Sequence, residues 1–141
     1  MYLAQRKRFQ KGSTAVEGAL TLTVFLVTFI GIIDIGSVLF RMQGLTERAR
    51  AGARWGVVNT YDATNIRNVV IYGNPAGTGG ALFGLTTELV SVSQVDLGDG
   101  ISKIRIRIDN YPFRMYTPFL AGNRTLSRVE VSLTSESLGA T

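Results

Sequence analysis

The strongest constraint on the fold is an apolar run over residues 13–40. Between Glu17 and Asp34 the sequence has no Asp, Glu, Lys or Arg, and apolar residues continue beyond Asp34 to Phe40. As a helix, positions 18–40 are roughly 34 Å long, enough to cross the hydrocarbon layer of a membrane if Asp34 lies near an interface. A buried helix of a soluble bundle would need other strongly apolar helices around it, and the sequence contains no second such run. We therefore expect a membrane-inserted helix.

The net charge of +5 is concentrated at the start of the chain. Four of the fifteen basic side chains precede the apolar run, with no acidic one among them: Arg6, Lys7, Arg8 and Lys11. The rest of the sequence is almost neutral, so it lacks the basic surface of a nucleic-acid-binding protein. Cys and His are absent, which excludes disulfides, thiolate or imidazole metal sites and histidine-dependent catalysis. We expect no enzymatic activity, no cofactor and no metal.

Residues 1–12 have the character of a leader. They are short and basic, and they end in a glycine at the start of the apolar run. An ordinary secretory signal is cut after its apolar region, whereas here the cleavable junction, Lys11-Gly12-Ser13, precedes it. Cleavage between Gly12 and Ser13 would leave the apolar helix on the mature protein. The dense basic cluster favours a cytoplasmic N-terminus, although basic residues also follow the helix.

The helical pattern continues beyond the apolar run. Small and apolar residues recur at a spacing of three to four from Val38 onward, which predicts one helix from Thr14 to about Asn59. Glycine in a helix interior costs about 1 kcal/mol relative to alanine, so Gly44, Gly52 and Gly56 indicate either close approach of neighbouring helices or simple tolerance of glycine. In the first case, Gly52→Leu would hinder assembly and spare membrane insertion.

The remaining sequence predicts a small α+β domain. A short helix is expected at Ala63–Tyr72, capped by Asp62 or Thr60, followed by a glycine-rich loop without a nucleotide-binding motif. Three runs then alternate apolar and polar residues around Val90, Ile106 and Val131, which predicts an antiparallel sheet with one face against the long helix. The Gly98-Asp99-Gly100 triplet is typical of a hairpin turn. Asp96, Asp99 and Asp109 lack the spacing of a calcium loop.

The N-terminal half resembles a known family. Gly12 followed by STAVE, with Glu17 fifth after the junction, reproduces the type IV prepilin pattern, and residues 11–58 as a whole resemble the TadE-like minor pilins or pseudopilins of tight-adherence pilus systems. The resemblance implies an α+β pilin-like fold: one long helix, one short helix and a small antiparallel sheet. It also implies cleavage between Gly12 and Ser13 by a prepilin peptidase.

Each of the two acidic residues of the apolar run has two interpretations. Thr14 to Glu17 has the pattern of a capping box, so Glu17 would cap the helix, whereas the prepilin spacing makes it an assembly residue. An ionisable residue in a membrane span is costly unless it reaches water or a partner. Asp34 is therefore expected either to pair with a neighbouring subunit or to be solvated at the membrane boundary.

Together these features predict a structural subunit with four segments. They are a leader (1–12), a transmembrane assembly helix (13–40), a continuation of that helix (41–60) and a globular α+β domain (61–141). The expected partners are membrane lipid, copies of itself or other pilins, a prepilin peptidase and an inner-membrane assembly platform. The expected location is the bacterial inner membrane and then an extracellular filament. The alternative is a monomeric single-span anchor that displays a small binding or adhesive domain.

Overall fold

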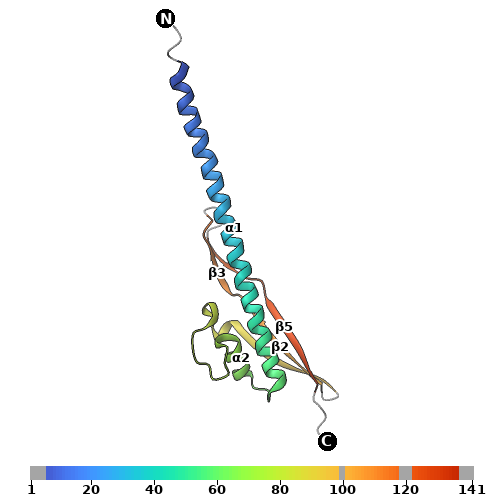
Figure 1. The fold of residues 1–141 in the computed structure, drawn as a ribbon. Helices are drawn as coiled ribbons and strands as arrows, with labels where there is room; N and C mark the ends of the chain where they lie inside the picture. Colours follow the sequence, from blue (N-terminus) through green and yellow to red (C-terminus); the bar gives the residue numbers. More distant parts are fainter. Residues whose placement is uncertain (1–5, 99–100, 118–121, 137–141) are drawn as a thin grey trace. The chain divides into compact units, whose positions relative to one another are not determined.

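A single helix, α1 (Arg6–Val58), dominates the first part of the chain (Figure 1). The computed structural model describes residues 6–98, 101–117 and 122–136. The predicted end of α1 near Asn59 is confirmed, but the helix begins eight positions before the expected start at Thr14. Thr14 and Glu17 therefore lie inside α1, and the interpretation of Glu17 as an N-terminal cap is wrong for the chain that retains residues 1–12.

The second helix, α2 (Ala63–Tyr72), has the predicted bounds and one of its two predicted caps. The Asp62 carboxylate accepts hydrogen bonds from the amides of Thr64 (2.8 Å) and Asn65 (3.2 Å). The helix ends at Gly73, whose left-handed backbone (φ 83°) favours glycine. Ile66, Val69, Val70 and Ile71 are the buried residues of α2.

In the described residues, five strands form two antiparallel sheets. The larger sheet has the order β1 (Val90–Gly98), β2 (Ile101–Ile108) and β5 (Val129–Glu136), with Val90 opposite Ile108 and Ile106 opposite Val131. The smaller sheet pairs β3 (Pro112–Met115) with β4 (Gly122–Thr125). Two short 3₁₀ turns, Leu82–Gly84 and Thr87–Leu89, precede β1. Of the predicted hairpin turn, Asp99 and Gly100 lie outside the described residues. The predicted α+β architecture is confirmed.

The chain divides into two compact units. The first unit contains α1 up to Ser37 and the segment that begins at Arg114. The second unit runs from Val38 to Phe113 and resumes at Asn123, so it contains the rest of α1, α2 and the three-stranded sheet.

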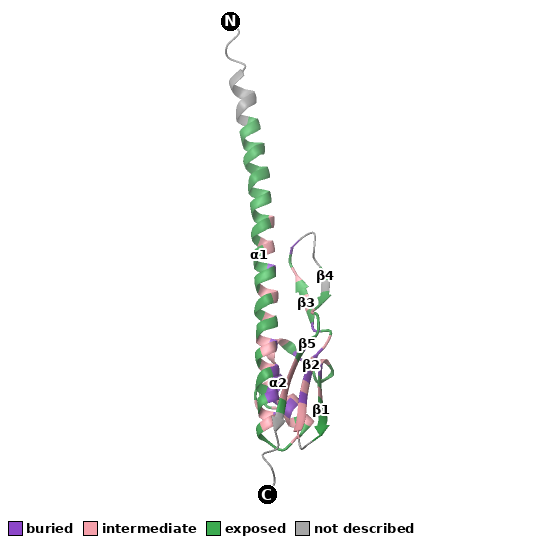
Figure 2. Ribbon diagram, turned by 90° about the vertical axis from the view of Figure 1, so that its right-hand side faces the viewer, coloured by how far each residue is buried: buried purple, intermediate pink, exposed green. Residues whose placement is uncertain are grey.

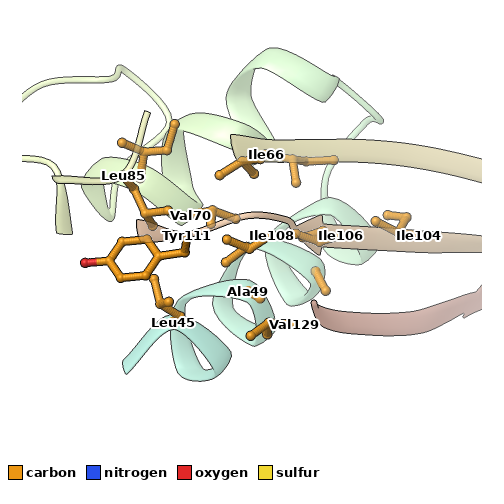
Figure 3. Close-up of a cluster of buried hydrophobic side chains, with 13 residues drawn as sticks. Leu45, Ala49, Ile66, Val70, Leu85, Ile104, Ile106, Ile108, Tyr111 and Val129 are labelled. Atoms are coloured by element: carbon orange, nitrogen blue, oxygen red, sulfur yellow. The ribbon is translucent and has the colours of Figure 1, made fainter. Parts of the chain in front are cut away.

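The core of the second unit lies where α1, α2 and β2 meet (Figure 3). Alternation along β2 buries Ile104, Ile106 and Ile108, the strand pattern that the sequence predicted. Leu45 and Ala49 enter the same core from α1 and are fully buried. The other face of β2 is basic, and Glu130 of β5 forms ion pairs with Arg105 (3.2 Å) and Arg107 (3.0 Å).

Candidate assembly site

Most residues of α1 between Gly12 and Phe40 are exposed (Figure 2), and many of them are apolar. Large apolar residues there are about half to two-thirds exposed: Val16, Leu20, Leu22, Val24, Phe25, Leu26, Phe29, Ile32, Ile33 and Ile35. The helix is long and apolar enough to cross a membrane, and only 6% of the residues in its most apolar stretch are buried. The core helix of a soluble protein would be mostly buried, so this surface indicates membrane association.

Hydroxyl groups in the apolar segment are satisfied within the helix itself. Thr21, Thr23 and Thr28 each donate a hydrogen bond to the backbone carbonyl four residues earlier, at 2.8 to 2.9 Å. These bonds remove the polarity that would oppose transfer into lipid. Glu17 is then the one charged side chain between Gly12 and Ile33, and it lies on the exposed surface.

The predicted cleavage junction lies on the same exposed stretch. Gly12 and Ser13 are exposed residues within α1, and a Cβ atom added to Gly12 would meet nothing within 4 Å. Packing within the chain therefore does not require glycine at this position. Ser13 precedes Glu17 by four residues, about one helical turn, so the two residues lie on one face of α1. Their roles in cleavage and assembly stay predictions.

Asp34 has a partner that neither sequence interpretation included. Its side chain is only 2% exposed, so the expected solvated carboxylate is wrong. Both carboxylate oxygens accept a hydrogen bond from the Tyr116 amide at 3.0 Å. Thr117 donates twice to the second oxygen, from its amide at 2.6 Å and from its hydroxyl. Pairing of Asp34 with a neighbouring subunit stays a prediction.

Thr117 reaches Asp34 from the short segment that follows β3. Along the end of β3 and the residues that follow, Arg114 and Tyr116 are exposed, whereas Met115 is half-buried and Thr117 is buried. Thr117 faces Asp34 with both its amide and its hydroxyl. The sequence contained no signal for this pairing, because 83 positions separate Asp34 from Thr117.

The three predicted assembly glycines, Gly44, Gly52 and Gly56, pack against other residues of the second unit. A Cβ atom added to Gly44 would lie 2.7 Å from the Phe83 ring, and one added to Gly52 would lie 2.5 Å from Val70. At Gly56 the corresponding distance is 2.7 Å to Ile66. Gly52 and Gly56 thus approach α2 of the same chain closely, and Gly44 approaches Phe83 in the turn Leu82–Gly84. A role for the same glycines in packing between subunits stays a prediction.

Comparison with known proteins finds a family that matches the N-terminal part of the chain. Residues 12–54 match the family described as TadE-like protein. No curated protein and no solved structure gives a significant match. The matched region begins at the predicted cleavage junction and includes Glu17, Asp34 and the first two of the three glycines. The matched region consists of the exposed apolar part of α1 and most of the part of α1 that belongs to the second unit. The chain therefore carries a TadE-like family domain at residues 12–54.

Proposed function

We propose that the chain is a pilin-like structural subunit of a tight-adherence pilus system. It enters the bacterial inner membrane through α1 and assembles by helix packing into a surface pilus or secretion pseudopilus. The observation that carries this proposal is an exposed apolar helix surface inside a TadE-like domain, on which Glu17 is the one charged residue between Gly12 and Ile33. A structural subunit also agrees with the lack of histidine and cysteine chemistry in the sequence.

The proposed mechanism begins with removal of the leader, residues 1–12. Cleavage creates an α-amine on Ser13 at the point where the apolar helix begins, and an unpaired ammonium group is costly in apolar surroundings. Glu17, one turn further on, neutralises its own amine or that of an adjoining subunit. Pairing with the adjoining subunit would set the register between helices in the filament. The partners are copies of the chain or other pilins, a prepilin peptidase and an inner-membrane assembly platform.

Replacement of Glu17 tests the charge pair. Removal of one partner of a buried ion pair costs about 3–5 kcal/mol, so we expect Glu17→Ala to reduce assembly by at least about two orders of magnitude. The variant should still be inserted and cleaved, and it should accumulate in the inner membrane. Glu17→Gln keeps the side chain's size and should be nearly as defective. Quantifying the subunit in sheared surface filaments and in membranes gives the answer, and normal assembly of the Gln variant would eliminate the charge pair.

Replacement of Gly12 tests the cleavage step separately. Gly12→Leu places a bulky side chain at a site that the resemblance assigns to glycine, and we expect the leader to be retained. Mass spectrometry of the N-terminus should find Ser13 first in the wild type and Met1 first in the variant. Assembled, functional wild-type filaments that still begin at Met1 would remove the cleavage step and leave the filament proposal standing.

A second candidate function is a monomeric membrane anchor that displays a small binding or adhesive domain. This function is favoured by Gly44, Gly52 and Gly56 of α1, which pack against other residues of the same chain and need no second subunit. An anchor requires a membrane span but no particular charge at Glu17. If Glu17→Ala is displayed on the surface normally and binds or adheres as well as the wild type, the result would favour the anchor over the filament subunit.

A further inference from the structure

The Asp34 interaction occurs where the uncharged part of α1 ends. No charged residue lies between Glu17 and Asp34, and Asp34 is where the segment Arg114–Thr117 is hydrogen-bonded to the helix. Both partners belong to the same compact unit. The bonded residues, Tyr116 and Thr117, follow the end of β3 as irregular backbone, and Arg114 and Tyr116 are exposed. We call Asp34 together with Arg114–Thr117 the Asp34 collar.

An irregular segment of this kind is incompatible with the hydrocarbon layer. Lipid-exposed irregular backbone does not occur there, because lipid tails cannot satisfy peptide groups. Asp34 satisfies the amides of Tyr116 and Thr117, but the exposed guanidinium of Arg114 still requires water or an anion. The hydrocarbon layer must therefore end at or before Asp34, short of Phe40, where the span predicted from hydropathy ends.

The remaining helix has the right length for the bilayer. From Ser13 to Ile33, α1 rises about 30 Å, which equals the usual thickness of the hydrocarbon layer. Residues 35–40 then extend about 9 Å further, through the polar headgroup region. Exposed Ile35 and Leu39 would lie in that region, beyond the lipid tails.

We propose that the Asp34 collar is a lipid-contacting surface that fixes the depth of the helix in the membrane, with its exposed side chains in the headgroup layer. Arg114 binds lipid phosphate, an anion that guanidinium recognises through two parallel hydrogen bonds. Tyr116 is 69% exposed, and tyrosine is enriched at membrane interfaces, where its ring meets both apolar and wet surroundings. The inference rests on membrane insertion of α1 and not on filament assembly.

Single cysteines can locate the membrane boundary, because the natural sequence has none. Phe29→Cys and Leu39→Cys replace side chains that are 51% and 60% exposed. We would reconstitute each full-length variant at a low protein-to-lipid ratio in vesicles of phosphatidylethanolamine and phosphatidylglycerol and add a membrane-impermeant maleimide. Leu39→Cys should react at least tenfold faster than Phe29→Cys, and detergent should remove the difference. Equal protection of both cysteines would place Leu39 in hydrocarbon and overturn the proposal.

Fluorescence tests the position of the collar itself. Tyr116→Trp keeps the backbone amide that binds Asp34, and Trp55→Phe removes the single native tryptophan. In vesicles that contain brominated lipids, bromines near the headgroup should quench the introduced tryptophan more than bromines deep in the acyl chain. Absence of quenching, or stronger quenching by the deep bromines, would contradict contact with headgroups. Quenching by the headgroup bromines that falls as the protein-to-lipid ratio rises would also contradict it, and would identify a second copy of the chain as the occupant.

Asp34→Asn tests whether the carboxylate holds the collar. The amide keeps the side chain's size but replaces one acceptor oxygen with a donor, opposite the donors of Tyr116 and Thr117. We expect severalfold less quenching of the tryptophan introduced by Tyr116→Trp and severalfold slower labelling of Leu39→Cys. Ser37→Ala is the matched control, because the Ser37 hydroxyl donates to the backbone carbonyl of Asp34 (2.8 Å) and not to its carboxylate. Wild-type values for Asp34→Asn in both assays would refute the role of Asp34. Every measurement uses unassembled protein, so a failure of filament assembly would leave this test unaffected.

Discussion

The two parts of α1 contain similar numbers of glycines in different surroundings. In the part that belongs to the first unit, a Cβ atom added to Gly18, Gly31 or Gly36 would meet nothing within 4 Å. In the part that belongs to the second unit, the corresponding atoms at Gly44, Gly52 and Gly56 would lie 2.5 to 2.7 Å from other side chains. The same residue type thus marks open surface in one part and a tight internal contact in the other.

The difference shows which surfaces the chain completes by itself. Leu45, Ala49 and Ala53 are fully buried beneath the domain, so this part of the helix already has its packing partner. Leu22 and Phe25 are about 60% exposed, and their covering must come from lipid or from other subunits. Small residues on a helix therefore identify a packing face, but they do not say whether the partner is the same chain or another one.

The largest expected effect on the stability of the isolated chain is that of Gly52→Leu. The sequence predicted that this change would affect assembly, whereas the structure places Val70, Ile106 and the carbonyl of Ile66 around the added atoms. Overpacking of a core costs about 1–3 kcal/mol, and we expect the upper end of that range because one neighbour is backbone. Thermal unfolding of the detergent-solubilised chain, followed by near-ultraviolet circular dichroism, measures the loss.

Gly36→Leu is the matched control, because its added side chain enters open space. It should leave the unfolding temperature of the globular unit unchanged. If both leucine variants unfold at the wild-type temperature, the distinction between the covered and the open part of α1 fails.

Asp62→Ala should have a smaller effect, confined to the second unit. The Asp62 carboxylate caps α2 through the amides of Thr64 and Asn65, and loss of such a cap costs about 1 kcal/mol. Because α2 covers Gly52 and Gly56, its weakening should loosen the covered part of α1 and leave the exposed part unchanged. Hydrogen exchange along α1 measures this directly. The exposed Glu88→Ala is the control, and equal exchange in both variants would show that the cap does not stabilise this packing.

Local sequence patterns predicted most of the fold. The bounds of α2, the Asp62 cap, the end of α1 and the alternation along β2 follow from propensity and periodicity within a few residues. The start of α1 was predicted too late, because Thr14 resembles a cap although the residues before it also favour a helix.

Contacts between distant residues could not be predicted in the same way. Asp34 and Thr117 are separated by 83 positions, and their pairing depends on where the segment after β3 returns to α1. The glycine face was recognised as a packing surface, but its partner depends on tertiary arrangement. The spacing of Ser13 and Glu17 is recognisable in the sequence. Their role in assembly depends on contacts with a neighbouring subunit, and those contacts do not follow from the sequence of one chain.

The smallest expected effect on the isolated chain comes from Gly31→Ala and Gly36→Ala. Each change should favour the helix by up to about 1 kcal/mol, since alanine is the better helix former and nothing lies within 4 Å of the added carbon. The unfolding temperature of the globular unit should not change, because both residues belong to the first unit. The yield of assembled filaments distinguishes two explanations for these glycines. If helices of neighbouring subunits pack closely at this face, the alanine variants should assemble less well, since one methyl group moves two helix backbones apart. Filament yields equal to wild type, measured in sheared surface material, would show that lipid or loosely packed side chains cover this face.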